Sequence, residues 1–193
     1  MRLFVGLDIP EAIRTAIANY VDELRRVAPD AKWVRPESYH VTLKFIGEWR
    51  RDVREVTSEL DQIEAPSLDV SFRNCGFFPN AKAPRVFWIG IAADSKLPSL
   101  AVQVDRACSA FGIESEDREY SPHLTLARSG SGSPRPKRHE PLAASMKRLA
   151  ERIAGIQAPD FGTMHATEFF LYESKLSPGG AKYIKLKSFR LGD

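Results

Sequence analysis

The sequence His40-Val41-Thr42-Leu43 returns in the second half of the chain as His123-Leu124-Thr125-Leu126. Each copy lies in a stretch typical of a β-strand, Tyr39 to Ile46 in the first half and His123 to Ala127 in the second. Side chains two apart on a strand point to the same face, so each copy is predicted to present a histidine and a threonine together, opposite aliphatic anchors. Because a core strand gains nothing from an imidazole beside a hydroxyl, the repetition indicates function.

Strict alternation also makes predictions for the residues that follow the first motif. It places Lys44 on the face of His40 and Thr42, where the amine would meet either the cleft or solvent. It places Phe45 on the opposite face, with the aliphatic anchors.

The same rule places Arg128 on the face of Leu124 and Leu126, away from His123. Arg128 reaches the histidine face only if the strand ends or bulges near Ala127. The Ser129-Gly130 sequence that follows favours such an interruption, and we therefore expect Arg128 to join the site.

The two halves share one predicted order of elements: strand, helix, His/Thr strand, helix, strand. In the first half these are expected at residues 3–9, 11–27, 39–46, 51–63 and 67–77. In the second half they are expected at residues 85–91, 97–111, 123–127, 142–153 and, as one long strand, 161–172, with a last strand at 183–191. Two such units related by a pseudo-twofold would set the two His/Thr faces opposite each other across a cleft. We expect one bilobal domain over residues 1–193, with sequence repeats at about 1–80 and 84–193 whose lobes are free to exchange strands.

Composition limits the class of protein. The chain has 193 residues, 43% of them hydrophobic and 27% charged, with a formal net charge of +3. This mild positive charge permits a polyanionic partner, but it is lower than expected for a protein whose main task is binding duplex nucleic acid. The N-terminus shows no signal sequence, and no apolar run approaches the ~20 residues that span a bilayer. We therefore expect a soluble cytoplasmic protein, without membrane association and monomeric, whose Cys75 and Cys108 are reduced and buried.

Two facing imidazoles suit concerted acid–base catalysis, because the ordinary pKa of histidine is about 6.5. One neutral ring accepts a proton from the nucleophile and one protonated ring donates to the leaving group. The two threonine hydroxyls can donate to the oxygens of a tetrahedral anion, most simply a phosphate. No metal or other cofactor is needed. A zinc site lacks its third and fourth ligands, and a Ser-His-Asp site lacks a GxSxG sequence.

Other charged residues carry less weight. His139 is interpreted as a solvated loop residue and His165 as a satisfied strand residue. Both His139 and the Arg135 to Arg138 run lie in a Gly/Ser/Pro-rich insert, residues 129–141, that we expect to be mobile. The run is most simply a solvated loop, although it could touch an RNA backbone.

At these residues the chain resembles the two-histidine (2H) phosphoesterases, and within them the RNA 2′,3′-cyclic phosphodiesterases of the LigT/ThpR type. The likeness covers nearly the whole chain, through the segments 3–7, 33–37, 40–48, 85–90, 122–128 and 171–176. It implies a bilobal α+β fold in which antiparallel sheets flank a central cleft. It also implies that His40 and His123 are catalytic and that Thr42, Thr125 and Arg128 bind the substrate phosphate.

The activity that the resemblance implies is metal-independent opening of an RNA 2′,3′-cyclic phosphate to a 2′-phosphomonoester. We expect His123 to activate water and His40 to protonate the departing 3′ oxygen, although near symmetry leaves that choice open. Some members also join tRNA halves through a 2′–5′ linkage. The alternatives are therefore a 2′–5′ RNA ligase, a phosphodiesterase for a small cyclic nucleotide, and a non-catalytic module that binds RNA ends.

Overall fold

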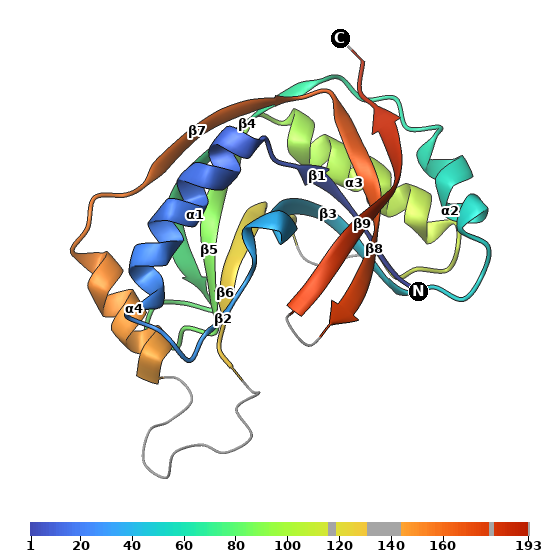
Figure 1. Cartoon of the computed structure of the whole chain (residues 1–193). Coiled ribbons are helices and arrows are strands. Elements are labelled where there is room, and N and C mark those ends of the chain that lie inside the picture. The colour runs from blue at the N-terminus through green and yellow to red at the C-terminus, as the bar shows by residue number, and fades with distance from the viewer. Residues whose placement is uncertain (116–118, 131–143, 178–179, 193) are drawn as a thin grey trace.

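The fold consists of two antiparallel sheets, seen in a computed structural model that describes residues 1–115, 119–130, 144–177 and 180–192 (Figure 1). The four-stranded sheet has the order β3-β1-β8-β9, with strands at His40–Glu48, Arg2–Asp8, Glu168–Ser177 and Gly180–Arg190. The five-stranded sheet has the order β2-β6-β5-β4-β7, with strands at Lys32–Trp33, His123–Arg128, Val86–Ala93, Leu68–Phe78 and Asp160–Ala166. The α+β class and the antiparallel sheets that the family resemblance implies are thus confirmed.

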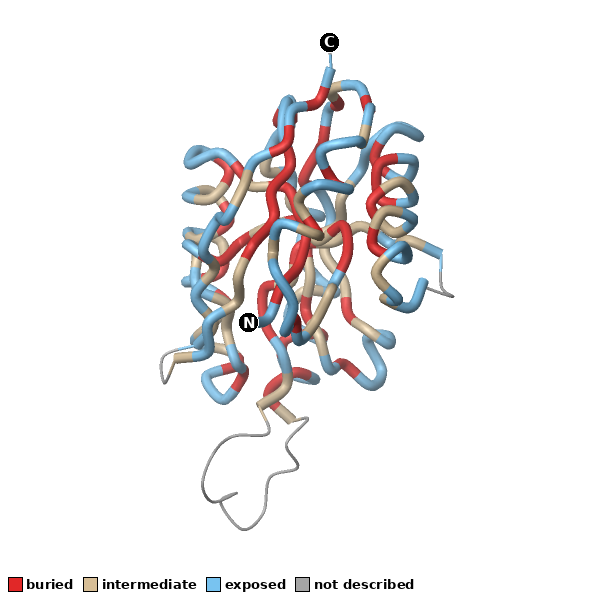
Figure 2. Tube along the Cα trace, turned by 90° about the vertical axis from the view of Figure 1, so that its right-hand side faces the viewer, coloured by how far each residue is buried: buried red, intermediate tan, exposed pale blue. Residues whose placement is uncertain are grey.

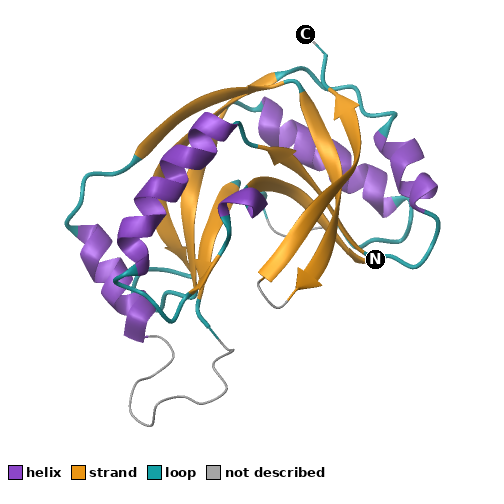
Figure 3. Ribbon diagram, in the orientation of Figure 1, coloured by secondary structure: helices purple, strands orange, loops and turns teal. Residues whose placement is uncertain are grey.

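Helices cover the outer side of each sheet and leave the inner sides facing one another (Figure 3). Helices α1 (Glu11–Arg25) and α4 (Ala144–Ala154) lie with the five-stranded sheet, while α2 (Val53–Leu60) and α3 (Lys96–Ser109) lie with the four-stranded sheet. A short 3₁₀ turn, η1 (Pro36–Ser38), leads directly into β3. Each sheet therefore has one face left for the site.

The helices form where apolar residues recur at helical spacing. In α1 the buried residues are Ile13, Ile17, Val21 and Leu24, which make one stripe along the helix. Helix α2 is shorter than the predicted 51–63 at both ends, and it ends at Leu60. It begins at Val53 because the side chain of Asp52 accepts a hydrogen bond from the amide of Arg54. The Asp52 N-cap was not predicted from the sequence.

The predicted long strand at residues 161–172 was wrong. It is two strands in different sheets: β7 pairs with β4, and β8 pairs with β1, with Thr167 between them. Figure 1 shows this segment crossing from one sheet to the other along the top of the molecule. A local pattern cannot reveal such a crossing, because the change of partner depends on strands that are distant in the sequence.

One hydrophobic core joins the two sheets. It contains residues from both, among them Val5 and Val41 of the four-stranded sheet and Ile89 and Leu124 of the five-stranded sheet. Figure 2 shows the buried residues concentrated in the central strands and on the inward sides of the helices. Strand β4, from the first half of the chain, pairs with β5 from the second half. The division into repeats at about 1–80 and 84–193 stays a prediction.

The two cysteines, which were both expected to be buried, differ in their exposure. Cys108 is buried, whereas Cys75 is only partly buried, with its Sγ 3.7 Å from the Tyr20 hydroxyl. Among the described residues, no helix has both the length and the apolar character needed to cross a membrane. The Arg135 to Arg138 run and His139 lie outside the described residues, as does all of the predicted mobile insert except Ser129 and Gly130.

Candidate active site

The two His/Thr motifs lie on β3 and β6, and each is paired with a strand that carries a glycine beside it. Gly6 of β1 pairs with Thr42, and Gly90 of β5 pairs with His123. A Cβ atom at either glycine would lie 2.7 Å from a backbone oxygen, that of Val41 at Gly6 and that of Arg73 at Gly90. Only glycine allows these close approaches. At Gly6 the close approach is to the motif strand β3 itself, whereas at Gly90 it is to β4, the neighbour of β5 on the side away from β6.

His40 is held in one orientation at the base of the four-stranded sheet. Its Nδ1 donates to the carbonyl oxygen of Ser38 at 2.8 Å, which leaves Nε2 to accept a hydrogen bond from the Thr42 hydroxyl at 3.0 Å. The rings of Phe4 and Tyr183 lie 4.6 and 4.9 Å from the imidazole, centroid to centroid. This enclosure lowers the pKa of His40 to about 4, because burial disfavours the charged ring.

His123 has the same backbone arrangement in a more open setting. Its Nδ1 donates to the carbonyl oxygen of Ser121 at 2.8 Å, and Phe78 packs edge-on at 5.0 Å between centroids. Burial lowers the pKa of His123 as well, and the positive charge of Arg128 adds to this. With Nδ1 carrying the proton in both rings, each Nε2 is available as a proton acceptor.

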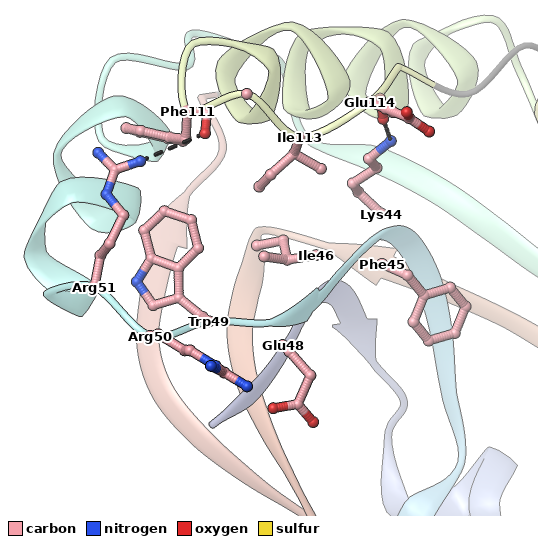
Figure 4. Close-up of a pocket in the computed structure, with 11 residues that line it drawn as sticks. Lys44, Phe45, Ile46, Glu48, Trp49, Arg50, Arg51, Phe111, Ile113 and Glu114 are labelled. Atoms are coloured by element: carbon pink, nitrogen blue, oxygen red, sulfur yellow. Dashed lines mark hydrogen bonds between the residues drawn. The ribbon is translucent and has the colours of Figure 1, made fainter.

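A bulge in β3 overturns the predictions for Lys44 and Phe45. Val5 pairs with Lys44 and the next residue, Gly6, pairs with Thr42, so Leu43 has no partner and the alternation shifts by one. Lys44 is therefore buried, 3% exposed, with its Nζ 2.7 Å from both an Asp105 carboxylate oxygen and the Glu114 carbonyl oxygen. Phe45 is 58% exposed, and Figure 4 shows its side chain pointing away from that of Lys44.

The same bulge occurs in β6 and acts on Arg128. Phe87 pairs with Ala127 and the next residue, Trp88, pairs with Thr125, so Leu126 is skipped. Leu126 and Ala127 are both buried, and Arg128 turns to the exposed side. This is the interruption near Ala127 on which the prediction for Arg128 depended. Arg128 and Phe45 thus hold equivalent positions, each re-aimed by a bulge.

The two motifs lie close together, since a positive charge on His123 lowers the pKa of His40. One pocket contains a residue of each motif, although His40, Thr125 and Arg128 are not among the residues that line it. Thr42 and Phe45 from β3 line the same pocket as His123 from β6 and Phe78 from β4. Arg128 lies close enough that its charge lowers the pKa of both His40 and His123. Across this junction the Tyr120 hydroxyl donates to the carbonyl oxygen of Thr42 at 2.8 Å, which ties the approach to β6 directly to β3.

Thr125 lies on the His123 face, since it pairs with Trp88 as His123 pairs with Gly90. Unlike Thr42, its hydroxyl makes no hydrogen bond to another described residue. His165 lies elsewhere, on β7, where its Nδ1 is 2.7 Å from a carboxylate oxygen of the exposed Asp69. Within the described ranges, no group of three or more His, Cys, Asp or Glu side chains is arranged to hold a metal.

Several site residues escaped the sequence analysis. Phe45 was placed on the wrong face, and Tyr120, Tyr183 and Phe78 come from segments outside the motifs. The sequence carries no signal for the bulges, because the skipped residues, Leu43 and Leu126, are the aliphatic residues that strict alternation also expects there.

This fold and this pair of motifs define a class of phosphoesterase. The LigT like Phosphoesterase family profile matches residues 7–88 and again residues 89–183, one match in each half of the chain. The chain belongs to this family.

Named relatives cover almost the whole chain. A protein of Methanocaldococcus jannaschii named RNA 2′,3′-cyclic phosphodiesterase is 33% identical over 98% of this chain and all of its own length. One of Archaeoglobus fulgidus with the same name is 32% identical over 98% of this chain and 99% of its own. Among solved structures, the protein TT0787 of Thermus thermophilus superposes with a TM-score of 0.73 at 28% identity over the full length of both chains.

Proposed function

We propose that this protein is an RNA 2′,3′-cyclic phosphodiesterase that opens the cyclic phosphate to a 2′-phosphomonoester without a metal ion. The observation that carries the proposal is the matched orientation of His40 and His123. Each ring donates from Nδ1 to a backbone carbonyl and keeps Nε2 for proton transfer. The names of the full-length relatives support the same substrate class.

In the proposed reaction, His123 Nε2 takes a proton from water as the water oxygen attacks phosphorus. The bond from phosphorus to O3′ breaks, and His40 Nε2 donates its proton to O3′. The reaction leaves a 2′-phosphomonoester, a protonated His123 and a neutral His40. Thr42, Thr125 and Arg128 would hold the phosphate oxygens as charge builds on them.

His40 can act as the acid only after it has gained a proton, because its pKa in the free protein is about 4. A bound anionic phosphate supplies the opposite charge that raises this pKa. Protonation has a second effect: a protonated Nε2 no longer accepts the Thr42 hydroxyl, which is then released to donate to a phosphate oxygen. Substrate binding, protonation of His40 and recruitment of Thr42 are therefore coupled.

The proposal includes the setting of the reaction. The substrates would be RNA or oligonucleotide ends that carry a 2′,3′-cyclic phosphate, including tRNA halves. The protein would act in the cytoplasm as a monomer.

The test is to incubate purified protein with a 2′,3′-cyclic mononucleotide in the presence of EDTA and to identify the product by ³¹P NMR. We expect full turnover to the nucleoside 2′-monophosphate. Loss of activity with EDTA that one divalent ion restores, or a 3′-monophosphate product, would overturn the proposal. Joining of RNA ends with no hydrolysis would favour the ligase instead, and binding of cyclic ends without turnover would favour the non-catalytic module.

A further inference from the structure

The site continues beyond the phosphate-binding residues along one side of β3. The pocket that contains Thr42 and His123 shares Lys44 and Phe45 with a second pocket, which extends past Trp49 to Arg51. β3 is the end strand of its sheet, and no described strand pairs with its outer edge. The two pockets are therefore neighbouring parts of one groove, which we call the β3 groove.

The second pocket combines an apolar interior with arginines at its rim (Figure 4). Ile46 and Ile113 face each other across it, and Trp49 and Phe111 close one end. The Arg51 guanidinium lies over both aromatic rings, 5.1 Å from the Trp49 centroid and 5.9 Å from that of Phe111, and also pairs with Glu55. Arg51 is thus committed to the protein itself.

Arg50 differs from its neighbour. Its side chain is exposed at the rim, and it makes no hydrogen bond or ion pair with any other described residue. The acidic groups on the same rim are Glu48 and Glu114, and Figure 4 shows the Glu48 side chain on the same side of the chain as Arg50. An uncommitted guanidinium beside an apolar hollow suits single-stranded nucleic acid, which offers a phosphate and a base face in each unit.

The distance along β3 sets the size of the ligand. Glu48 lies six residues beyond Thr42 on the strand, roughly 20 Å at the rise of an extended chain. A mononucleotide whose phosphate lies between His40 and His123 does not extend that far, whereas an oligonucleotide does.

We propose that the β3 groove receives the RNA chain that leads to the cyclic phosphate, with Arg50 contacting a backbone phosphate several nucleotides from the reacting end. This inference rests on the proposed function and deepens it. It assigns the protein a preference for oligonucleotide ends over 2′,3′-cyclic mononucleotides. Glu48 would oppose the same phosphate and limit the affinity.

The test compares kcat/KM for a 2′,3′-cyclic mononucleotide and for a hexanucleotide that ends in the same nucleotide. Arg50→Ala should lower the value for the hexanucleotide about three- to tenfold and leave the mononucleotide unchanged. Glu48→Gln should raise kcat/KM for the hexanucleotide. Arg50→Lys keeps the positive charge, so its kcat/KM for the hexanucleotide should stay close to that of the wild type. The control is Arg26→Ala, which removes an exposed charge at the end of α1, on the other side of the molecule. This variant should leave kcat/KM unchanged for both substrates.

A binding measurement gives a second readout that needs no turnover. Fluorescence anisotropy with a hexanucleotide that ends in a 2′-phosphate should show a salt dependence of log Kd that is shallower by about 0.7 in Arg50→Ala. Equal kcat/KM for both substrates in wild type, or equal loss in Arg50→Ala and Arg26→Ala, would overturn the inference while the proposed hydrolysis stands. Failure to hydrolyse either substrate would instead count against the proposed function.

Discussion

The strands β3 and β6 carry the same motif and the same bulge, yet they place their histidines in unequal surroundings. His40 is enclosed by Phe4 and Tyr183 and accepts a hydrogen bond from the Thr42 hydroxyl. Among the described residues, the only aromatic ring that His123 meets is the edge-on ring of Phe78, and the Thr125 hydroxyl has no hydrogen-bond partner. The residues re-aimed by the bulges also differ, Phe45 on β3 and Arg128 on β6. The same motif and bulge thus give two chemically different half-sites, because the side chains packed around each motif differ.

The largest expected effects come from the histidines themselves. His40→Ala and His123→Ala should each lower kcat by about 10²–10⁴-fold, since each removes one partner in proton transfer. Steady-state kinetics with a 2′,3′-cyclic mononucleotide measure this. The matched control is His165→Ala on β7, which should leave kcat unchanged; an equal loss there would mean that the assignment of the two motif histidines is wrong.

The two bulge positions should differ in the size of their effect. Arg128→Ala removes a guanidinium that can donate two hydrogen bonds to a charged oxygen, so we expect a loss of about 3 kcal/mol, roughly 150-fold in kcat/KM. Phe45→Ala removes no charge, and for a mononucleotide its effect should stay below about tenfold. Thermal melts serve as the control, because both side chains point out of the core. An unchanged kcat/KM in Arg128→Ala would remove that residue from the site.

Thr42→Ala and Thr125→Ala should have similar effects on kcat/KM but different effects on the pKa of the neighbouring histidine. Each substitution by alanine removes a single neutral donor to the phosphate, so the expected loss is about 1.5 kcal/mol, roughly tenfold in kcat/KM. Only Thr42→Ala should also raise the pKa of His40, because the Thr42 hydroxyl stabilises the neutral ring. NMR titration of the imidazole signals distinguishes the two variants, and an equal shift of the matching histidine in Thr125→Ala would contradict the difference between the half-sites.

The smallest effect is a displacement of the pH profile. Because burial lowers the pKa of both histidines, each limb of the bell-shaped profile of kcat/KM should move to lower pH. We expect the maximum below about pH 6.5, the ordinary pKa of histidine. The two limbs belong to the pair and not to single residues. A rate that keeps rising above pH 8 would indicate attack by hydroxide without an imidazole acid.

The sequence predicted the parts of the molecule that depend on local pattern. The two motifs and the order of elements up to residue 160 follow from short-range patterns, and the family resemblance implied the α+β class. The local pattern did not predict the crossing at Thr167, because the strands that pair with β7 and β8 are far away in the sequence. The local pattern also failed to predict the face of Phe45 and the burial of Lys44, since one skipped residue reverses strict alternation. The low pKa of His40 depends on rings from β1 and β9, which no motif around His40 contains.

His40 and His123 should act as one catalytic unit in spite of their unequal surroundings. The most direct measurement is kcat for the double variant His40→Ala/His123→Ala beside the two single variants, all in EDTA. Because both rings act in one concerted step, the double variant should be about as slow as the slower single variant. A double variant whose loss equals the product of the two single losses would show that the histidines act independently, which would contradict the concerted mechanism.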